Sequence, residues 1–165
     1  MIDIVRFQGE KFNLGFKEII YFKDLKIVIG GSENLNRKAV EDKSVDILMR
    51  PETESEKDKV HYRVSGLNQV LCKLANKNKV AIGFSFSDLL NSKYKDKVIG
   101  RMMQNVRLCR KYNVKMVICS FAKEKFEMRA AKDLISFGLT IGMTGKEAND
   151  ALSFKRKDKE IELIK

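Results

Sequence analysis

Lysine and arginine are the chemically active side chains that this sequence concentrates most. Residues 93–132 hold twelve of them against three acidic residues, which gives this stretch +9 of the formal net charge of +11. Ammonium and guanidinium groups at such a density bind phosphate oxygens and attract polyanions. The chemistry that this stretch predicts is recognition of a phosphate backbone.

Residues that catalyse reactions or ligate metals are scarce by comparison. His61 is the single histidine, and it lies in a charged segment without a second histidine to share a metal. Gly30-Gly31 precedes a helical segment without a phosphate-loop or dinucleotide-binding motif. Ser85 and Ser87 lack the context of a nucleophile and are expected to cap helices. We therefore expect no catalytic residue, no metal and no cofactor bound by this chain.

Short apolar runs alternate with amphipathic segments, as in β/α units with a largely parallel sheet. Strands are predicted at residues 2–5, 18–22, 25–29, 45–49, 80–84 and 114–119. Helices are predicted at residues 33–42, 67–78, 95–112, 130–141 and 145–152. The runs 80–84 and 114–119 are almost continuously apolar, so both are expected near the middle of the sheet. Thr144 and Glu147 have the spacing of a capping box for the last helix.

Length and composition predict one globular α/β domain over residues 1–165. Residues 51–65 are charged and poor in apolar side chains, so this loop is expected to be the most mobile segment. The charge-mixed tail at 154–165 is expected to add an edge strand at 160–164. The start of the chain does not read as a secretory signal, and no apolar run is long enough to cross a bilayer.

The cysteines indicate the compartment. Cys72, Cys109 and Cys119 are odd in number, lie far apart and form no C-x-x-C pair, so neither a disulfide framework nor a zinc site is predicted. Buried thiols in a reducing cytosol are the expectation. The chain is therefore predicted to be cytoplasmic.

The segment 95–112 separates into two faces at about 100° per residue. Val98, Met102, Val106 and Cys109 fall on an apolar arc, whereas a basic arc gathers Lys97, Arg101, Gln104, Arg107 and Lys111. Two interpretations stay open from these residues alone. The basic arc is either a solvated surface or a site that binds nucleic-acid phosphates.

Ligand contacts in α/β folds lie just past the carboxyl ends of the strands. At or near the carboxyl ends of the predicted strands lie Arg37, Arg50, Lys123 and Arg129. The planar fork of arginine suits phosphate better than the point charge of lysine does. A surface salt bridge is the alternative role for each of them.

The order of several segments resembles the archaeal ribonuclease P protein component 3 family. The resemblance covers residues 25–152. It is carried by Leu35-Asn36-Arg37-Lys38-Ala39-Val40, Val45-Asp46-Ile47-Leu48, Ser65-Gly66-Leu67-Asn68-Gln69-Val70-Leu71, Val80-Ala81-Ile82-Gly83-Phe84-Ser85-Phe86-Ser87-Asp88-Leu89-Leu90, Arg101, Asn105-Val106-Arg107-Leu108-Cys109-Arg110-Lys111-Tyr112, Ser120 with Ala122, and Met128-Arg129-Ala130-Ala131-Lys132-Asp133-Leu134.

This resemblance implies a TIM-like β/α barrel, similar in fold to metal-dependent phosphoesterases but without their activity. It implies a noncatalytic subunit that helps a catalytic RNA, which holds Mg²⁺, to remove the 5′ leader of precursor tRNA. It also implies a small ferredoxin-like or RRM-like protein subunit as partner. The sequence departs from the family in its shortened opening, residues 1–24, and in Ala131, where proline is common. The short opening predicts an incomplete or open barrel.

We therefore expect an RNA-binding subunit of ribonuclease P that positions phosphates without reading sequence. The predicted contacts are Arg37, Arg101, Arg107, Lys111, Lys123, Arg129 and Lys132. Two alternatives stay open. One is a degenerate barrel phosphoesterase-like enzyme acting on a phosphorylated small molecule, and the other is a pure protein scaffold.

Overall fold

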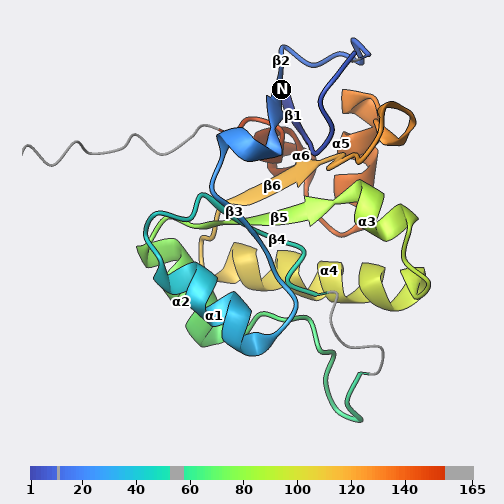
Figure 1. Cartoon of the computed structure of the whole chain (residues 1–165). Coiled ribbons are helices and arrows are strands. Elements are labelled where there is room, and N and C mark those ends of the chain that lie inside the picture. Colours follow the sequence, from blue (N-terminus) through green and yellow to red (C-terminus); the bar gives the residue numbers. More distant parts are fainter. Residues whose placement is uncertain (11, 53–57, 155–165) are drawn as a thin grey trace, which may run out of the picture.

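Parallel strands alternate with helices along the chain, as predicted (Figure 1). The computed structural model describes residues 1–10, 12–52 and 58–154. The strands there are β1 (Ile2–Val5), β2 (Glu18–Tyr21), β3 (Ile27–Ile29), β4 (Ile47–Met49), β5 (Ala81–Ser85) and β6 (Met116–Cys119). The α-helices are α1 (Glu33–Glu41), α2 (Gln69–Lys77), α3 (Phe86–Leu90), α4 (Lys95–Lys111), α5 (Ala131–Thr140) and α6 (Gly145–Ala151). The 3₁₀ turns are η1 (Phe22–Asp24) and η2 (Lys125–Glu127).

The strands form two parallel ladders that meet at β1 and β6. The larger sheet has the order β3-β4-β5-β6, and β1 pairs with β2. Beyond the end of β6, the Phe121 amide donates to the Ile4 carbonyl at 2.9 Å, so β1 continues the curved array. β5 and β6 thus both lie inside the array, as expected from their apolar runs. In the described part of the chain no ladder joins β2 to β3, and the predicted incomplete barrel is confirmed.

A buried carboxylate fastens β1 to β6. The Asp3 side chain accepts hydrogen bonds from the Ser120 amide at 2.6 Å and from the Ser120 hydroxyl at 2.5 Å. Burial raises the pKa of Asp3 to about 6, against the effect of these hydrogen bonds. The junction of the two ladders is therefore polar at its centre and apolar on either side.

The alternation of side chains along each strand produces two cores. Leu48, Ile82 and Ile118 point outward and pack against the helices, which cover the outer face of the sheet. Ile47 and Val117 point inward with residues of β1 and fill the concave side. Gly83 also lies there, and a Cβ at this position would be 2.6 Å from the Met49 sulfur. Glycine at this place therefore lets Met49 fill the interior.

Two helix caps that the sequence predicts are confirmed, those at Ser85 and at Thr144. The capping box of Thr144 and Glu147 opens α6 as predicted. Ser85 caps α3 as predicted, by accepting from the Asp88 amide at 3.1 Å, although no helix was predicted at residues 86–90. Ser87 lies inside α3 and donates to Glu127, so the prediction that it caps a helix is wrong. Five residues are too few to show a helical period, which explains why α3 was missed. The predicted tail strand at 160–164 lies outside the described residues.

All three cysteines are free and buried, as predicted. Burial raises the pKa of the Cys72 thiol to about 11, which keeps it protonated and unreactive at neutral pH. Over the part of the chain that the structure describes, none of the helices has the length and apolar character to span a bilayer.

Candidate nucleic-acid interface

Helix α4 has the two faces that its sequence predicts. Met102 and Val106 are fully buried in the outer core, whereas Arg107 and Lys111 are exposed. Lys97 is partly buried, with its ammonium nitrogen 4.9 Å from the centre of the Tyr94 ring. The exposed cations therefore stand on a helix that is fixed to the sheet by its opposite face.

Arg101 is not part of this exposed surface, although its position on the helical wheel placed it there. Its side chain is only 2% exposed, and its Nε atom lies 2.8 Å from Asp58 Oδ1. Residues 58–65 fold over this part of α4, which the helix period cannot reveal. The interpretation of Arg101 as a phosphate contact is therefore corrected to that of a positioning residue for this loop.

A buried polar cluster lies between the same loop and α4. Asn105 donates to the Ser65 carbonyl at 2.8 Å and, at 3.4 Å, to the buried carboxyl group of Glu52. Burial raises the pKa of Glu52 to about 8, which the charge of Arg50 and the bond from Asn105 only partly offset. The Glu52 carboxyl is therefore protonated at neutral pH. No pattern in the sequence marks this cluster, because its members are separated by about forty to fifty residues.

Arg110, which falls on the apolar side of the wheel, ties α4 to α6. Its Nε and Nη2 atoms donate to both carboxylate oxygens of Glu147 at 2.7 Å, and Nη2 also reaches the Gly142 carbonyl at 2.8 Å. This bidentate pair lowers the pKa of Glu147 to about 2. Arg110 is thus a structural residue.

A second basic group lies beyond the end of β6. Lys123 and Lys132 are exposed there, and Arg129 is half-buried with its guanidinium 5.1 Å from the centre of the Phe86 ring. Glu127 organises this connection by accepting hydrogen bonds from the Lys123 amide, at 2.8 Å, and from the Ser87 hydroxyl. The segment is therefore held against α3 with its cations on the outside.

The remaining strand-end arginines differ in exposure. Arg37 on α1 has an exposed side chain whose Nε atom lies 2.9 Å from Glu41 Oε1. Arg50 follows β4 with a φ of 47° and donates to Asp88 Oδ1 at 3.0 Å. Asp88 is almost fully buried, so this pair links the end of β4 to α3, the helix that follows β5. Arg50 is suited to holding these two elements together, whereas Arg37 is open to solvent.

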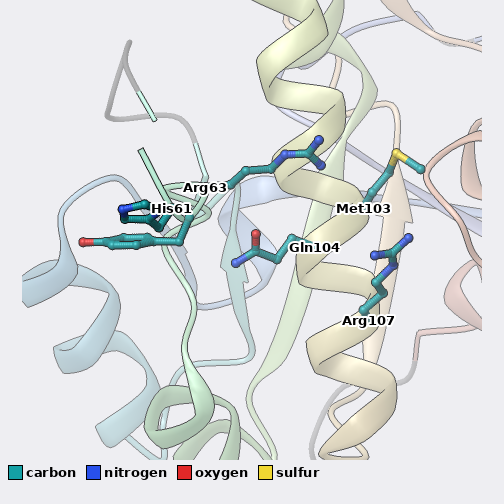
Figure 2. A pocket seen from close by; sticks show the side chains of 6 residues that line it. His61, Arg63, Met103, Gln104 and Arg107 are labelled. Atoms are coloured by element: carbon teal, nitrogen blue, oxygen red, sulfur yellow. The ribbon is translucent and has the colours of Figure 1, made fainter. Parts of the chain in front are cut away.

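A groove of about 500 Å³ lies beside the exposed part of α4 (Figure 2). Its lining residues come from the loop and from the helix, and they are His61, Tyr62, Arg63, Met103, Gln104 and Arg107. The sequence marked only Arg107 among them as a contact. The others were missed because they gather only when the loop folds over α4.

The structure thus divides the predicted contacts that are accessible into two groups and one isolated residue. Arg107 and Lys111 share α4, while Lys123, Arg129 and Lys132 share the connection from β6 to α5. Arg37 stands apart on α1. Within residues 1–10, 12–52 and 58–154, no three histidine, cysteine or acidic side chains gather as metal ligands.

Comparison with known proteins identifies the family. The family model described as RNase P subunit p30 matches residues 15–157. Ribonuclease P protein component 3 of Methanosarcina mazei is 39% identical over 132 residues, which are 79% of this chain and 52% of that protein. The protein of the same name from Thermococcus gammatolerans is 40% identical over 134 residues, which are 80% of this chain and 59% of that protein. This chain belongs to the RNase P subunit p30 family.

A chain in a solved assembly has a similar fold. A chain of the cryo-EM structure of archaeal ribonuclease P with mature tRNA superposes with a TM-score of 0.73 at 21% identity, covering 93% of this chain and 87% of that one. This likeness confirms the α/β arrangement. The chain spans between half and three fifths of the length of the two p30 relatives named above.

Proposed function

We propose that this p30-family chain is a noncatalytic, RNA-binding subunit of ribonuclease P, which helps the catalytic RNA to remove the 5′ leader of precursor tRNA. The observation that carries the proposal is the exposed basic face of α4, which is held rigidly by the buried face of the same helix. Rigid placement matters because the contacts must position an RNA rather than merely attract it. Family membership supplies the identity of the RNA.

The proposed contacts are the predicted residues without the buried Arg101, namely Arg37, Arg107, Lys111, Lys123, Arg129 and Lys132. Most of them form two groups on separate elements, which suits a folded RNA that touches the protein at several phosphates. Arg101 holds residues 58–65 in place instead. The RNA would carry the Mg²⁺ that the reaction needs, and the particle would act in the cytoplasm.

We further propose the small ferredoxin-like or RRM-like subunit of ribonuclease P as the protein partner. Support comes from the open side of the barrel, where β2 and β3 are not joined by a ladder within the described residues. Both strands are only partly buried, in contrast to the fully buried β4 and β5. Strand edges left in this way are surfaces that another protein can cover.

Recovery of bound RNA tests the function. The tagged full chain is purified from its host at moderate salt, and the RNA that accompanies it is sequenced. We expect strong enrichment of ribonuclease P RNA, and less of it with an Arg107→Gln/Lys111→Gln variant that melts like the wild type. A chain that brings down no RNA, or the same RNA pool as an unrelated basic protein, would overturn the proposal.

A further inference from the structure

We propose that the groove between residues 58–65 and α4 binds one unpaired RNA nucleotide. Its base would lie against Tyr62 and His61, with its flanking phosphates on Arg63 and Arg107. This inference rests on the proposed function, because it names the part of the RNA that the basic face of α4 receives.

The loop that forms one wall of the groove is held in a fixed shape. Asp58 accepts hydrogen bonds from the buried Arg101 and from the Val64 amide, each at 2.8 Å. The Lys59 amide closes a turn on the Tyr62 carbonyl at 3.0 Å. The tip is nevertheless open to solvent, with Tyr62 63% exposed. These contacts join residues 58–65 to α4, whereas the mobility expected of residues 51–65 stays a prediction, and residues 53–57 lie outside the described parts.

A glycine within α4 makes room for the Arg63 side chain, which lines the groove. Glycine inside a helix costs roughly 1 kcal/mol relative to alanine. A Cβ at Gly100 would be only 2.9 Å from Arg63 Nη1, which donates to the Gly100 carbonyl at 2.8 Å. Gly100 therefore allows the guanidinium of Arg63 to lie directly on the helix.

Two arginines are among the residues that line the groove. Figure 2 shows Arg63 reaching over α4 from the loop and Gln104 extending from the helix toward His61. Seven residues of helix, about 10 Å, separate Gly100, where Arg63 docks, from Arg107. The arginines are thus spaced for different phosphates. The guanidinium of Arg63 has five N–H groups, so a ligand can receive donors other than the one bound to Gly100.

The other residues that line the groove favour a nucleobase as its ligand. A phenol ring exposed beside cations is a stacking surface for a base, and an amide such as that of Gln104 can both donate to and accept from a base edge. Met103 adds an apolar, polarisable contact. A volume of about 500 Å³ suits a single nucleotide. The nucleotide must be unpaired, because bases within an RNA duplex are stacked on both faces.

The absence of tryptophan from the sequence provides a direct test. A Tyr62→Trp variant of the full chain carries one fluorescent indole in the groove, and a Leu139→Trp variant carries one on the exposed surface of α5. We expect an unstructured oligouridine to quench the first and not the second. A fully paired RNA duplex should quench neither, even where it binds the basic face.

Two further variants measure what the groove contributes to affinity for oligouridine. Tyr62→Ala should lower this affinity about 10-fold, whereas Tyr62→Phe, which keeps the ring, should stay within about 2-fold of the wild type. Gly100→Ala should melt no lower than the wild type yet bind more weakly, because its methyl group displaces the Arg63 side chain.

The outcomes separate this inference from the proposed function. Oligouridine binding in a gel-shift assay, with unchanged fluorescence of Tyr62→Trp and unchanged affinity of Tyr62→Ala, would overturn the groove alone. If the fluorescence of Tyr62→Trp changes when the small protein subunit is added but not when RNA is added, the groove is a protein contact, and the inference is also overturned. Absence of any RNA binding by the wild type would overturn the proposed function and the groove together.

Discussion

At the scale of single residues, burial decides which charged side chains can meet a ligand. Arg101 and Arg107 lie on the same side of the helical wheel, yet one is enclosed by Asp58 and the other is exposed. The sequence could identify the basic arc and the apolar arc of this helix. It could not identify Arg101 as buried, because the acid that pairs with it is 43 residues away in the chain.

The buried carboxyl of Glu52 makes stability depend on pH. The pKa of Glu52 is about 8 in the folded protein, whereas its ordinary value, which applies in the unfolded chain, is 4.5. Folding at a pH between these two values is therefore coupled to the uptake of a proton. Its contribution to stability is full below pH 4.5 and is lost as the pH rises toward 8. The pKa of Asp3 is also raised, but only to about 6, so the range from pH 6 to 8 isolates Glu52.

We therefore expect the free energy of unfolding to fall with pH in this range, by at most about 1.4 kcal/mol per pH unit from this group. Glu52→Gln should flatten the dependence, as measured by urea unfolding at several pH values. Glu147→Gln is the matched control. The lowered pKa of Glu147 acts only between about 2 and 4.5, so this variant should keep the slope of the wild type. Equal slopes for Glu52→Gln and the wild type would refute the buried, protonated state.

At the scale of elements, the apolar periodicity of the sequence predicted the longer helices and the strands. It did not predict the short helix α3 or the groove that residues 58–65 form with α4. The five longer helices and six strands follow from apolar patterns, with ends that differ by a few residues. Helix α3 was missed, since it is one short turn capped by Ser85. The groove was missed because residues 58–65 are polar and show no period, although they contact α4 at Gly100 and Arg101.

The exposed face of α4 predicts a specific salt dependence. Replacing Arg107, Lys111 and the partly buried Lys97 by glutamine removes two proposed phosphate contacts and one neighbouring charge, and it leaves the buried face intact. The affinity for ribonuclease P RNA should fall, and the slope of log K against log salt should become shallower by roughly 0.7 to 0.9 for each phosphate that is no longer neutralised. Filter binding at several salt concentrations measures both quantities.

Arg101→Gln is the comparison for this prediction. It should destabilise the fold, by about 2 kcal/mol, because it removes the charged hydrogen bond between the buried Arg101 and the partly exposed Asp58 carboxylate. The threefold variant should melt within about 4 °C of the wild type, because substitutions of surface charges change stability little. An unchanged salt slope in a well-folded threefold variant would show that the face of α4 is only solvated.

At the scale of the whole molecule, the chain is an open β/α array that belongs to a family of ribonuclease P subunits. β1 and β2 continue the sheet beyond β6 but, within the described residues, form no ladder with β3. This incomplete closure agrees with the prediction from the sequence. The sequence could not predict how β1 would be held, because the bonds of Asp3 to Ser120 span 117 residues.

Reconstitution of precursor tRNA cleavage tests the central claim most directly. Ribonuclease P RNA and its other protein subunits are assembled with and without this chain, and release of the 5′ leader is followed at low Mg²⁺. We expect faster release when the chain is present, most of all together with the small subunit, and no release by the chain alone. Cleavage by the RNA-free chain, or an unchanged rate when it is omitted, would contradict the account.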